Sequence, residues 1–244
     1  MRTDFGTLIE NINIAKDVYQ MCIRTEIAKE VQCGQFVQVD IPGFFLRRPI
    51  SVSEVTEDGE LVLVYKVVGD GTKIMAELVP GMKIDLFGPL GTGFPVEERD
   101  VLLLGGGVGV PPLIETAKRY IAKGHKVTAV LGFNAKQDVI LEERFREVGV
   151  DVYCATMDGS YGVKGTVLDA VKENSITDTF VLSCGPLPML KAVSNTYTDG
   201  YVSLEARMAC GMGACMGCVV KDEEGNSLRV CKDGPVFPIG KVVL

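Results

Sequence analysis

Short apolar stretches alternate with polar, turn-forming residues over the first part of the chain, from about Phe5 to Phe94. This pattern is typical of β-strands joined by tight turns. The predicted strands cover residues 6–15, 18–27, 35–41, 49–55, 61–68 and 82–87. A short helix is expected over residues 73–78. Together these elements indicate a small antiparallel barrel.

The pattern changes after Asp100, where apolar runs of strand length are followed by longer stretches of helical period. Alternation of strand and helix is typical of a parallel sheet covered by helices. The expected strands are residues 101–104, 126–131, 150–155 and 180–184. The expected helices are residues 113–123, 141–148, 167–173 and 189–196.

The last forty residues hold four cysteines, a polar stretch at 222–226 that predicts a hairpin turn, and a short apolar tail. They contain too few apolar residues for a core of their own. The sequence therefore predicts an α+β multidomain protein. Its parts are an antiparallel β-barrel over residues 1–97, a parallel α/β domain over 98–204 and a small C-terminal domain over 205–244.

Composition limits the functions to consider. Hydrophobic residues make up 47% of the 244, and 25 Lys and Arg stand against 32 Asp and Glu, for a net charge of −7. With no basic run, nucleic acid and anionic membranes are poor partners. The N-terminus lacks the apolar core of a signal peptide, and four glycines interrupt the longest apolar run, so we expect a cytoplasmic protein without a membrane span. Eight cysteines in such a chain favour metal or redox chemistry over disulfides.

The four C-terminal cysteines have an informative spacing. Four residues separate Cys210 from Cys215, two separate Cys215 from Cys218, and twelve separate Cys218 from Cys231. Plant-type ferredoxins hold a 2Fe-2S cluster with this kind of spacing. A structural zinc site prefers two separate pairs of closely spaced ligands, so zinc or free thiols are the weaker alternatives.

Two further regions have features of nucleotide sites. Arg48 can neutralise a diphosphate, Pro49, Ile50 and Ser51 can offer backbone groups to a flavin ring, and Val64-Tyr65-Lys66 precedes Gly71-Thr72 at a helix start. The alternative is a surface arginine pair and a helix cap at Thr72.

The second region is a glycine-rich loop after the strand predicted at 101–104. It contains Gly105, Gly107 and Gly109, and it departs from the Gly-x-Gly-x-x-Gly pattern because Val110 takes the third glycine's place. Pro111 is expected in the first turn of the following helix. A glycine turn without a ligand is the alternative. Cys184 and Gly185 end a later strand, where α/β sheets bind ligands, although a buried cysteine is more often inert.

In combination these motifs resemble the ferredoxin-NADP reductase superfamily. Residues 48–51 resemble its flavin motif, residues 105–109 with Pro111 its pyridine-nucleotide loop, and residues 184–186 the element beside the nicotinamide. Residues 203–218 and 230–237 are similar to the electron-transfer subunits of NAD-dependent (class 1B) dihydroorotate dehydrogenases. That resemblance covers essentially the whole chain.

The resemblance implies an electron relay between NAD(H), FAD and the 2Fe-2S cluster. It also implies an FMN-containing dihydroorotate dehydrogenase catalytic subunit as partner, in a dimer of heterodimers that serves pyrimidine biosynthesis. Cys184 is implied to act beside the nicotinamide. The residues implied to bind cofactors are Arg48, Pro49, Ile50, Ser51, Val64, Tyr65, Lys66, Gly71, Thr72, Gly105, Gly107, Gly109, Pro111 and Gly185, and those implied to bind iron are Cys210, Cys215, Cys218 and Cys231.

Three questions stay open at this point. The segment 131–134 lacks an arginine for a 2′-phosphate, which favours NAD over NADP, but Lys136 follows closely. Related flavin subunits of sulfhydrogenases or bifurcating transhydrogenases share the three-part plan. A redox sensor or zinc-binding interaction module, without enzymatic activity, is the alternative from another class.

Overall fold

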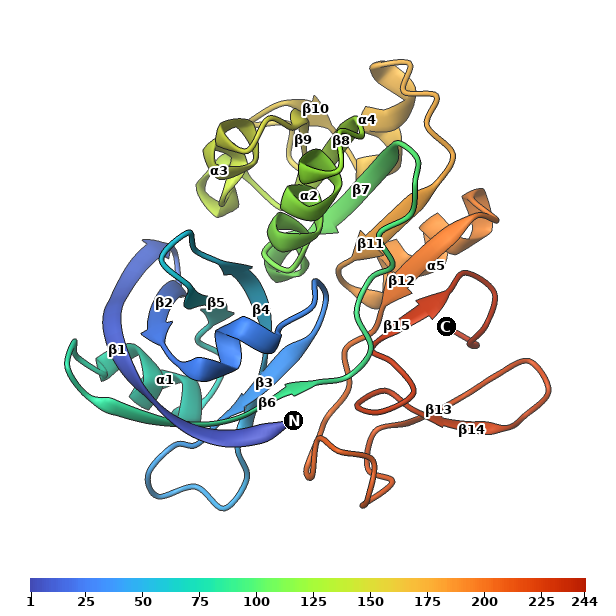
Figure 1. Ribbon diagram of the computed structural model, residues 1–244. Coiled ribbons are helices and arrows are strands. Elements are labelled where there is room, and N and C mark those ends of the chain that lie inside the picture. Colours follow the sequence, from blue (N-terminus) through green and yellow to red (C-terminus); the bar gives the residue numbers. More distant parts are fainter.

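The structure, a computed structural model, describes all 244 residues in three bodies (Figure 1). The barrel, coloured blue to green, lies below the α/β domain, and the C-terminal segment, coloured red, lies beside both. No helix is both long and apolar enough to cross a membrane.

The first body is a closed antiparallel barrel, as predicted. Its strands follow the order β1-β2-β5-β4-β3-β6, and pairing of β1 with β6 closes it. Alternate side chains of these strands fill the interior, among them Leu8, Met21, Ile23 and Leu63. The barrel elements are β1 (Arg2–Ala15), β2 (Val18–Arg24), η1 (Glu26–Glu30), β3 (Phe36–Val39), β4 (Arg48–Val55), β5 (Glu60–Lys66), α1 (Asp70–Glu77) and β6 (Lys83–Leu90).

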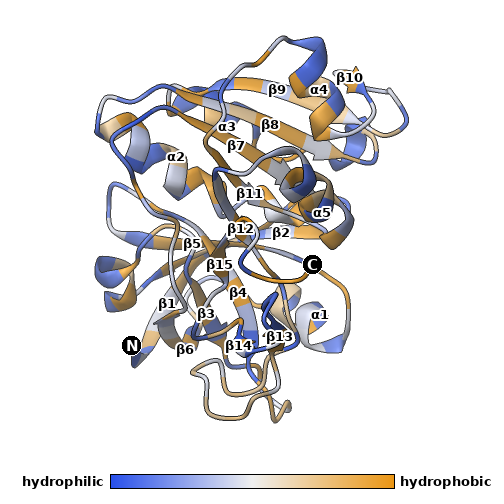
Figure 2. Ribbon diagram, turned by 90° about the vertical axis from the view of Figure 1, so that its right-hand side faces the viewer, coloured by the Kyte–Doolittle hydropathy of each residue, from blue (hydrophilic) through white to orange (hydrophobic).

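The second body is a mostly parallel sheet with helices on its faces, also as predicted. The strand order is β10-β9-β8-β7-β11-β12-β15, with β7 in the middle. In Figure 2 the central strands are apolar and the helices carry polar outer faces. Its elements are β7 (Val101–Gly106), η2 (Gly107–Gly109), α2 (Leu113–Ala122), β8 (Val127–Phe133), η3 (Lys136–Asp138), α3 (Glu142–Glu147), β9 (Asp151–Thr156), β10 (Val163–Lys164), α4 (Val167–Glu173), β11 (Val181–Cys184), α5 (Leu187–Thr196) and β12 (Gly200–Ser203).

One detail of this body differs from the sequence prediction. Pro111 was expected inside the first turn of α2, but the helix begins at Leu113. Pro111 lies in the turn before it, where its carbonyl oxygen accepts hydrogen bonds from the backbone of Ile114 and the hydroxyl of Ser53. Residues 110–112 therefore connect the glycine loop, which ends at Gly109, to the helix that begins at Leu113.

The C-terminal segment depends on the other two bodies. It contains β13 (Val219–Lys221), β14 (Ser227–Arg229) and β15 (Val236–Pro238), and the hairpin turn predicted at 222–226 joins the first two. Strand β15 pairs antiparallel with β12 and so extends the nucleotide-domain sheet. The apolar residues of the C-terminal segment pack with Phe36 of the barrel and Leu190 of α5. They are therefore buried against the other two bodies instead of in a core of their own.

A buried carboxylate joins the barrel to the α/β domain. Glu54 of β4 pairs with Arg144 of α3 at 2.7 Å and with Lys118 of α2 at 3.2 Å. Burial raises the pKa of Glu54, but the hydrogen bonds and charges of Arg144 and Lys118 lower it by more, so the pKa of Glu54 is below its usual value.

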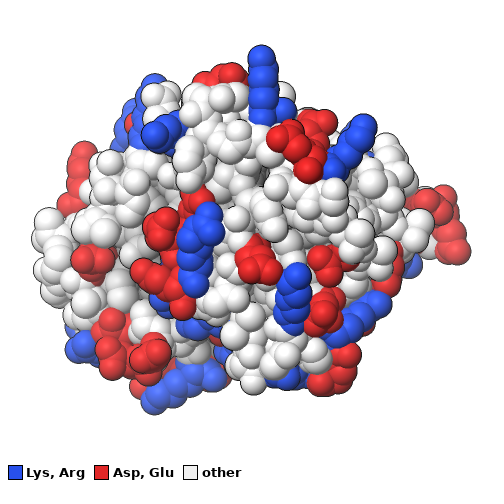
Figure 3. Space-filling model, turned by 90° about the horizontal axis from the view of Figure 1, so that it is seen from above, with Lys and Arg blue, Asp and Glu red and all other residues white.

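The surface of the molecule carries charges of both signs. On the face seen in Figure 3, acidic and basic side chains are interspersed.

The Glu54 network predicts a pH-dependent stability. Glu54→Gln should lower the free energy of unfolding near neutral pH by about 1 to 3 kcal/mol, because two cations lose their buried partner. Since folding lowers this pKa, the wild-type advantage exists above the unfolded pKa and is lost as the pH falls through the folded one.

Urea unfolding of the wild type and the variant over a pH series measures this difference. Glu57→Gln is the matched control, because Glu57 is an exposed turn residue. A difference that persists unchanged into acid would contradict the assignment.

Candidate functional site

Two of the four C-terminal cysteines, Cys210 and Cys215, lie on a loop, and Cys218 and Cys231 flank the β13–β14 hairpin. They associate two by two. The backbone N–H groups of Ala214 and Cys215 donate to Cys210 Sγ at 3.2 and 3.4 Å. The N–H of Cys231 donates to Cys218 Sγ at 3.4 Å. Cys215 is exposed and Cys218 is buried.

The protonation of these thiols fits metal ligation. Burial raises the pKa of Cys210, but N–H groups aimed at its sulfur outweigh this and lower the pKa to about 6. Burial and the nearby sulfur of Cys218 raise the pKa of Cys231 to about 12. A metal cation placed between two close sulfurs stabilises both of them as thiolates.

This donor set fits a 2Fe-2S cluster, in which two cysteines hold each iron. The side-chain positions by themselves do not separate iron from zinc, so the assignment rests on the spacing of the four cysteines.

Two polar side chains hold the cysteine loop in place. Arg229 of β14 donates to Gly213 O at 3.0 Å and pairs with Asp233 at 3.1 Å. Gln38 of β3 is buried and donates to Ala209 O at 3.1 Å, which ties the loop to the barrel. The sequence analysis missed both, because neither residue belongs to a motif.

The region predicted to bind flavin combines the start of β4 with the N-terminus of α1. Arg47 is paired with Asp85 at 2.8 Å, but Arg48 has no acidic partner. The Arg48 guanidinium lies 4.5 Å from the centre of the Phe44 ring and against Gly71. A free cation beside a helix N-terminus is suited to a diphosphate.

Other predicted flavin residues have structural tasks. The helix begins at Asp70 with Gly69 as its N-cap, so Thr72 lies inside the first turn and is not the cap residue itself. Its hydroxyl oxygen accepts hydrogen bonds from the N–H groups of Val68 and Gly69, which stabilises the start of the helix. Tyr65 is buried in the barrel, where its hydroxyl donates to Asn11 at 3.0 Å. Only the backbone of Tyr65 is therefore free for a ligand. Pro49, Ile50 and Ser51 are half-buried in β4, Val64 is buried, and Lys66 is exposed at the end of β5.

A cavity of about 570 Å³ lies at the carboxyl edge of the parallel sheet. Its size suits a small-molecule or cofactor site. The glycine loop after β7 borders its middle, Gly185 after β11 borders one side, and the ends of β8 and β9 border the other. Of the predicted nucleotide residues, Gly107, Gly109 and Gly185 line it, whereas Gly105 and Pro111 do not.

Several polar residues line the cavity. Lys66, predicted as a flavin residue, and Lys16 contribute from the barrel. Asn134 and Asp138 contribute from the segment after β8, and Glu205 from the segment after β12; of these five residues the sequence analysis did not single out Lys16, Asp138 and Glu205. Lys136 is the residue that left NADP as an alternative to NAD in the sequence analysis. It does not line the cavity, and its ammonium group lies 5.8 Å from the centre of the Tyr161 ring. A periodicity search cannot find the five cavity residues as a group, because they lie at or after the ends of four different strands.

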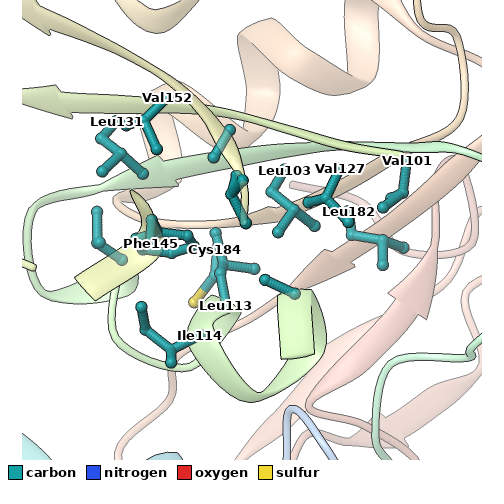
Figure 4. Close-up of a cluster of buried hydrophobic side chains, with 14 of the residues drawn as sticks. Val101, Leu103, Leu113, Ile114, Val127, Leu131, Phe145, Val152, Leu182 and Cys184 are labelled. Carbon is teal, nitrogen blue, oxygen red and sulfur yellow. The ribbon is translucent and has the colours of Figure 1, made fainter. Parts of the chain in front are cut away.

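Cys184 lies behind the cavity wall. Figure 4 shows it among apolar side chains that include Leu113 and Phe145. Burial, reinforced by the nearby charge of Glu205, raises the pKa of its thiol to about 12. Gly109 packs directly on the backbone of Cys184, so this residue supports the glycine loop from below.

Comparison with known proteins agrees with this arrangement. Family models match residues 6–94 (oxidoreductase FAD-binding domain), 103–195 (oxidoreductase NAD-binding domain) and 205–243 (iron-sulfur cluster binding domain of dihydroorotate dehydrogenase B). A dihydroorotate dehydrogenase B (NAD(+)) electron transfer subunit from Fusobacterium nucleatum is 46% identical over 97% of each chain. The chain belongs to this family of electron transfer subunits. It accordingly has FAD-binding, NAD-binding and iron-sulfur domains.

Two further relatives extend the comparison. The dihydroorotate dehydrogenase B electron transfer subunit of Streptococcus thermophilus is 45% identical over 98% of this chain and 97% of its own. A solved structure of an NADH-dependent reduced ferredoxin-NADP oxidoreductase, studied for electron bifurcation, aligns with a TM-score of 0.89 at 32% identity, covering 98% of this chain and 89% of that chain. In sequence, the chain is nearer to the dihydroorotate dehydrogenase subunits.

The glycine loop supplies a testable prediction. A Cβ on Gly109 would lie 2.5 Å from the Cys184 carbonyl oxygen, whereas one on Gly107 would meet nothing within 4 Å. Gly109→Ala should therefore cost about 2 to 3 kcal/mol of stability through overpacking. Gly107→Ala should cost only about 1 kcal/mol, because its φ of +53° is strained for alanine. Urea unfolding without nucleotide checks the order, and equal losses would contradict the packing described.

Proposed function

We propose that this chain carries electrons between NAD(H) and the FMN-containing catalytic subunit of an NAD-dependent dihydroorotate dehydrogenase, through bound FAD and a 2Fe-2S cluster. In this role it serves the oxidation of dihydroorotate to orotate in pyrimidine biosynthesis. Sequence identity of 46% to a curated subunit over nearly the whole chain is the observation that carries the proposal. We infer a cytoplasmic location, because four of the eight cysteines are assigned to iron and none forms a disulfide.

The proposal assigns one cofactor to each body. The barrel, residues 1–97, would hold FAD; residues 98–204 would hold NAD(H); and residues 205–244 would hold the cluster. The matched family ranges support these boundaries. When bound, the flavin converts the two-electron chemistry of NAD(H) into the single-electron chemistry of the cluster.

The residues of the chain have separate tasks in this scheme. Arg48 would neutralise the flavin diphosphate, with Gly71 and Thr72 at the helix N-terminus, and the backbones of Pro49, Ile50 and Ser51 and of Val64, Tyr65 and Lys66 would face the ring. The loop containing Gly105, Gly107, Gly109 and Pro111 would hold the dinucleotide, with Gly185 beside the nicotinamide. Cys184 would act as a positioning residue beneath that loop. Cys210, Cys215, Cys218 and Cys231 would ligate iron.

An exposed apolar surface surrounds the cluster loop and suits the catalytic subunit. The side chains of Phe45 and Met216 are 100% and 51% exposed. Near them, a shallow cavity of about 530 Å³ is bordered by Leu46, Met212 and the ligand Cys215. Exposed apolar surface of this kind marks protein contacts. A partner docked here would pass the electrons from dihydroorotate to the cluster, and two such pairs would form the dimer of heterodimers.

Reconstitution tests the function directly. The chain is mixed with a candidate FMN-containing dihydroorotate dehydrogenase subunit, and dihydroorotate-dependent NAD⁺ reduction is measured. Activity should need both proteins. Phe45→Ser should weaken assembly, whereas the matched control Val79→Ser, an exposed apolar site outside the surface around the cluster, should not. If NADH reduces the bound flavin but no dihydroorotate coupling is found, the partner is of the bifurcating or sulfhydrogenase type.

The assignment of Arg48 is tested by two glycines at the start of α1. A Cβ on Gly71 would collide with the Arg48 guanidinium, whereas one on Gly69 would meet nothing within 4 Å. Because the flexible arginine can move aside, Gly71→Ala should leave the fold intact but weaken FAD binding by roughly tenfold, about 1.4 kcal/mol. Gly69→Ala should retain FAD. Flavin titration of both apoproteins measures this, and equal affinities would refute the role of Arg48.

A further inference from the structure

Strand β3 forms a wall between the barrel and the cysteine loop. Its side chains alternate in direction, as those of any strand do. Val37 and Val39 pack in the barrel core, whereas Phe36 packs with the C-terminal segment. Gln38 shares the face of Phe36, and its Nε2 donates to Ala209 O at 3.1 Å. One short strand therefore contacts both the barrel interior and the loop that carries the first two cysteines.

The same strand adjoins the residues assigned to flavin. Gln38 pairs in register with Pro49 of β4, the strand that carries residues 48–51. Gln38 also borders the shallow cavity of about 530 Å³ together with Cys210 and Cys215. Its backbone thus lies beside the flavin motif, while its side-chain amide contacts the residue that precedes a cluster ligand.

The contact between Gln38 and the loop is tight. Gln38 is only 2% exposed, so its amide would be costly to leave without a partner. Gly211 lies against it, and a Cβ at that position would collide with Gln38 Nε2. The φ of Gly211 is +67°, which also favours glycine there. The bond to Ala209 is the only side-chain hydrogen bond between the barrel and residues 209–218.

This hydrogen bond adds something that the apolar contacts of the segment do not provide. Apolar packing against Phe36 holds the segment to the barrel, but burial of apolar surface has no preferred direction. A hydrogen bond has a defined length and angle. Gln38 is therefore the side chain that can fix where the cysteine loop lies along the face of β3.

We propose that Gln38 sets the position of the cluster loop relative to β4 and thereby controls the rate of electron exchange between the cluster and the flavin. This inference rests on the proposed function. In this step one electron passes between the flavin and one iron of the cluster, which changes between Fe(III) and Fe(II), and Gln38 undergoes no chemical change. Gln38 is a positioning residue, because its effect comes from where it holds the loop. Small displacements of reacting groups can be costly in rate.

Gln38→Met tests the proposal, because methionine has a similar length but no group that donates to Ala209. The holoprotein is mixed with NADH in an anaerobic stopped-flow instrument. Flavin bleaching should keep its wild-type rate, because the change lies on the opposite side of β4 from the nucleotide domain. The following bleaching of the cluster should slow about 10- to 100-fold. Gln32→Met is the matched control at an exposed glutamine before β3, and both of its phases should match the wild type.

Two further readouts separate placement from other effects. For one electron, a tenfold change in equilibrium constant corresponds to about 59 mV. The midpoint potentials of flavin and cluster in Gln38→Met should each stay within this range of the wild type, so that a changed driving force does not explain the slowing. In the apoprotein, hydrogen exchange of residues 209–215 should be faster in the variant, because the loop has lost its tie to the barrel.

Gly211→Ala reaches the same contact from the side of the loop. The added Cβ would displace the Gln38 amide, so cluster bleaching should slow here as well. Gly225→Ala is the matched control for backbone strain, because its φ is +84° and nothing lies within 4 Å of the added Cβ. Since Gln38→Met and Gly211→Ala break one shared contact, the double variant should be no slower than the slower single variant.

Cluster bleaching at the wild-type rate in Gln38→Met would overturn the proposal, and so would a potential shift large enough to account for the slowing. Loss of iron from Gln38→Met would overturn it too, because Gln38 would then be needed to assemble the cluster. A wild-type protein that binds no flavin or iron would instead refute the proposed function, so the two failures are distinguishable.

Discussion

The shared burial of apolar side chains between the three bodies fixes where each functional group lies. Val64 and Phe94 of the barrel pack into the core of the nucleotide domain, and Phe36 packs with the cluster segment. Because protein cores are close-packed, these contacts leave little freedom for the bodies to shift. An electron relay needs this rigidity, since its carriers must keep fixed distances from one another. The ion pairs of Glu54 with Arg144 and Lys118 cross the interface between the barrel and the nucleotide domain, and they favour one orientation of the two bodies.

Electrostatics divides the molecule into two kinds of site. Around the cysteines, backbone N–H groups point at sulfur, and Arg229 brings a cation close, so negative charge is stabilised. Around the nucleotide cavity, lysine, asparagine and acidic side chains line the wall instead. The first environment favours the thiolates that metal ligation requires, and the second offers charged and polar groups to a cofactor.

Most of the fold was predictable because its signals are local. The strand and helix patterns gave the barrel, the parallel sheet and even the hairpin turn at 222–226. Individual side-chain directions were harder to predict. Tyr65 and Thr72 belong to the predicted flavin motif, yet the Tyr65 hydroxyl donates to Asn11 and the Thr72 hydroxyl accepts from the N–H of Gly69 at the start of α1. Cys184 points into the apolar core, because the pleat of β11 directs its side chain away from the cavity.

The sequence by itself determined the three-part plan and the cysteine and glycine motifs, because ligand spacing and loop chemistry are properties of neighbouring residues. Only the tertiary structure decided that β15 completes the nucleotide sheet, that Gln38 anchors the cluster loop, and that Glu205 faces the same cavity as Gly185. These residues lie far apart along the chain. They meet because strand pairing and core packing bring distant parts of the chain together. No periodic pattern of residues in the sequence indicates such contacts.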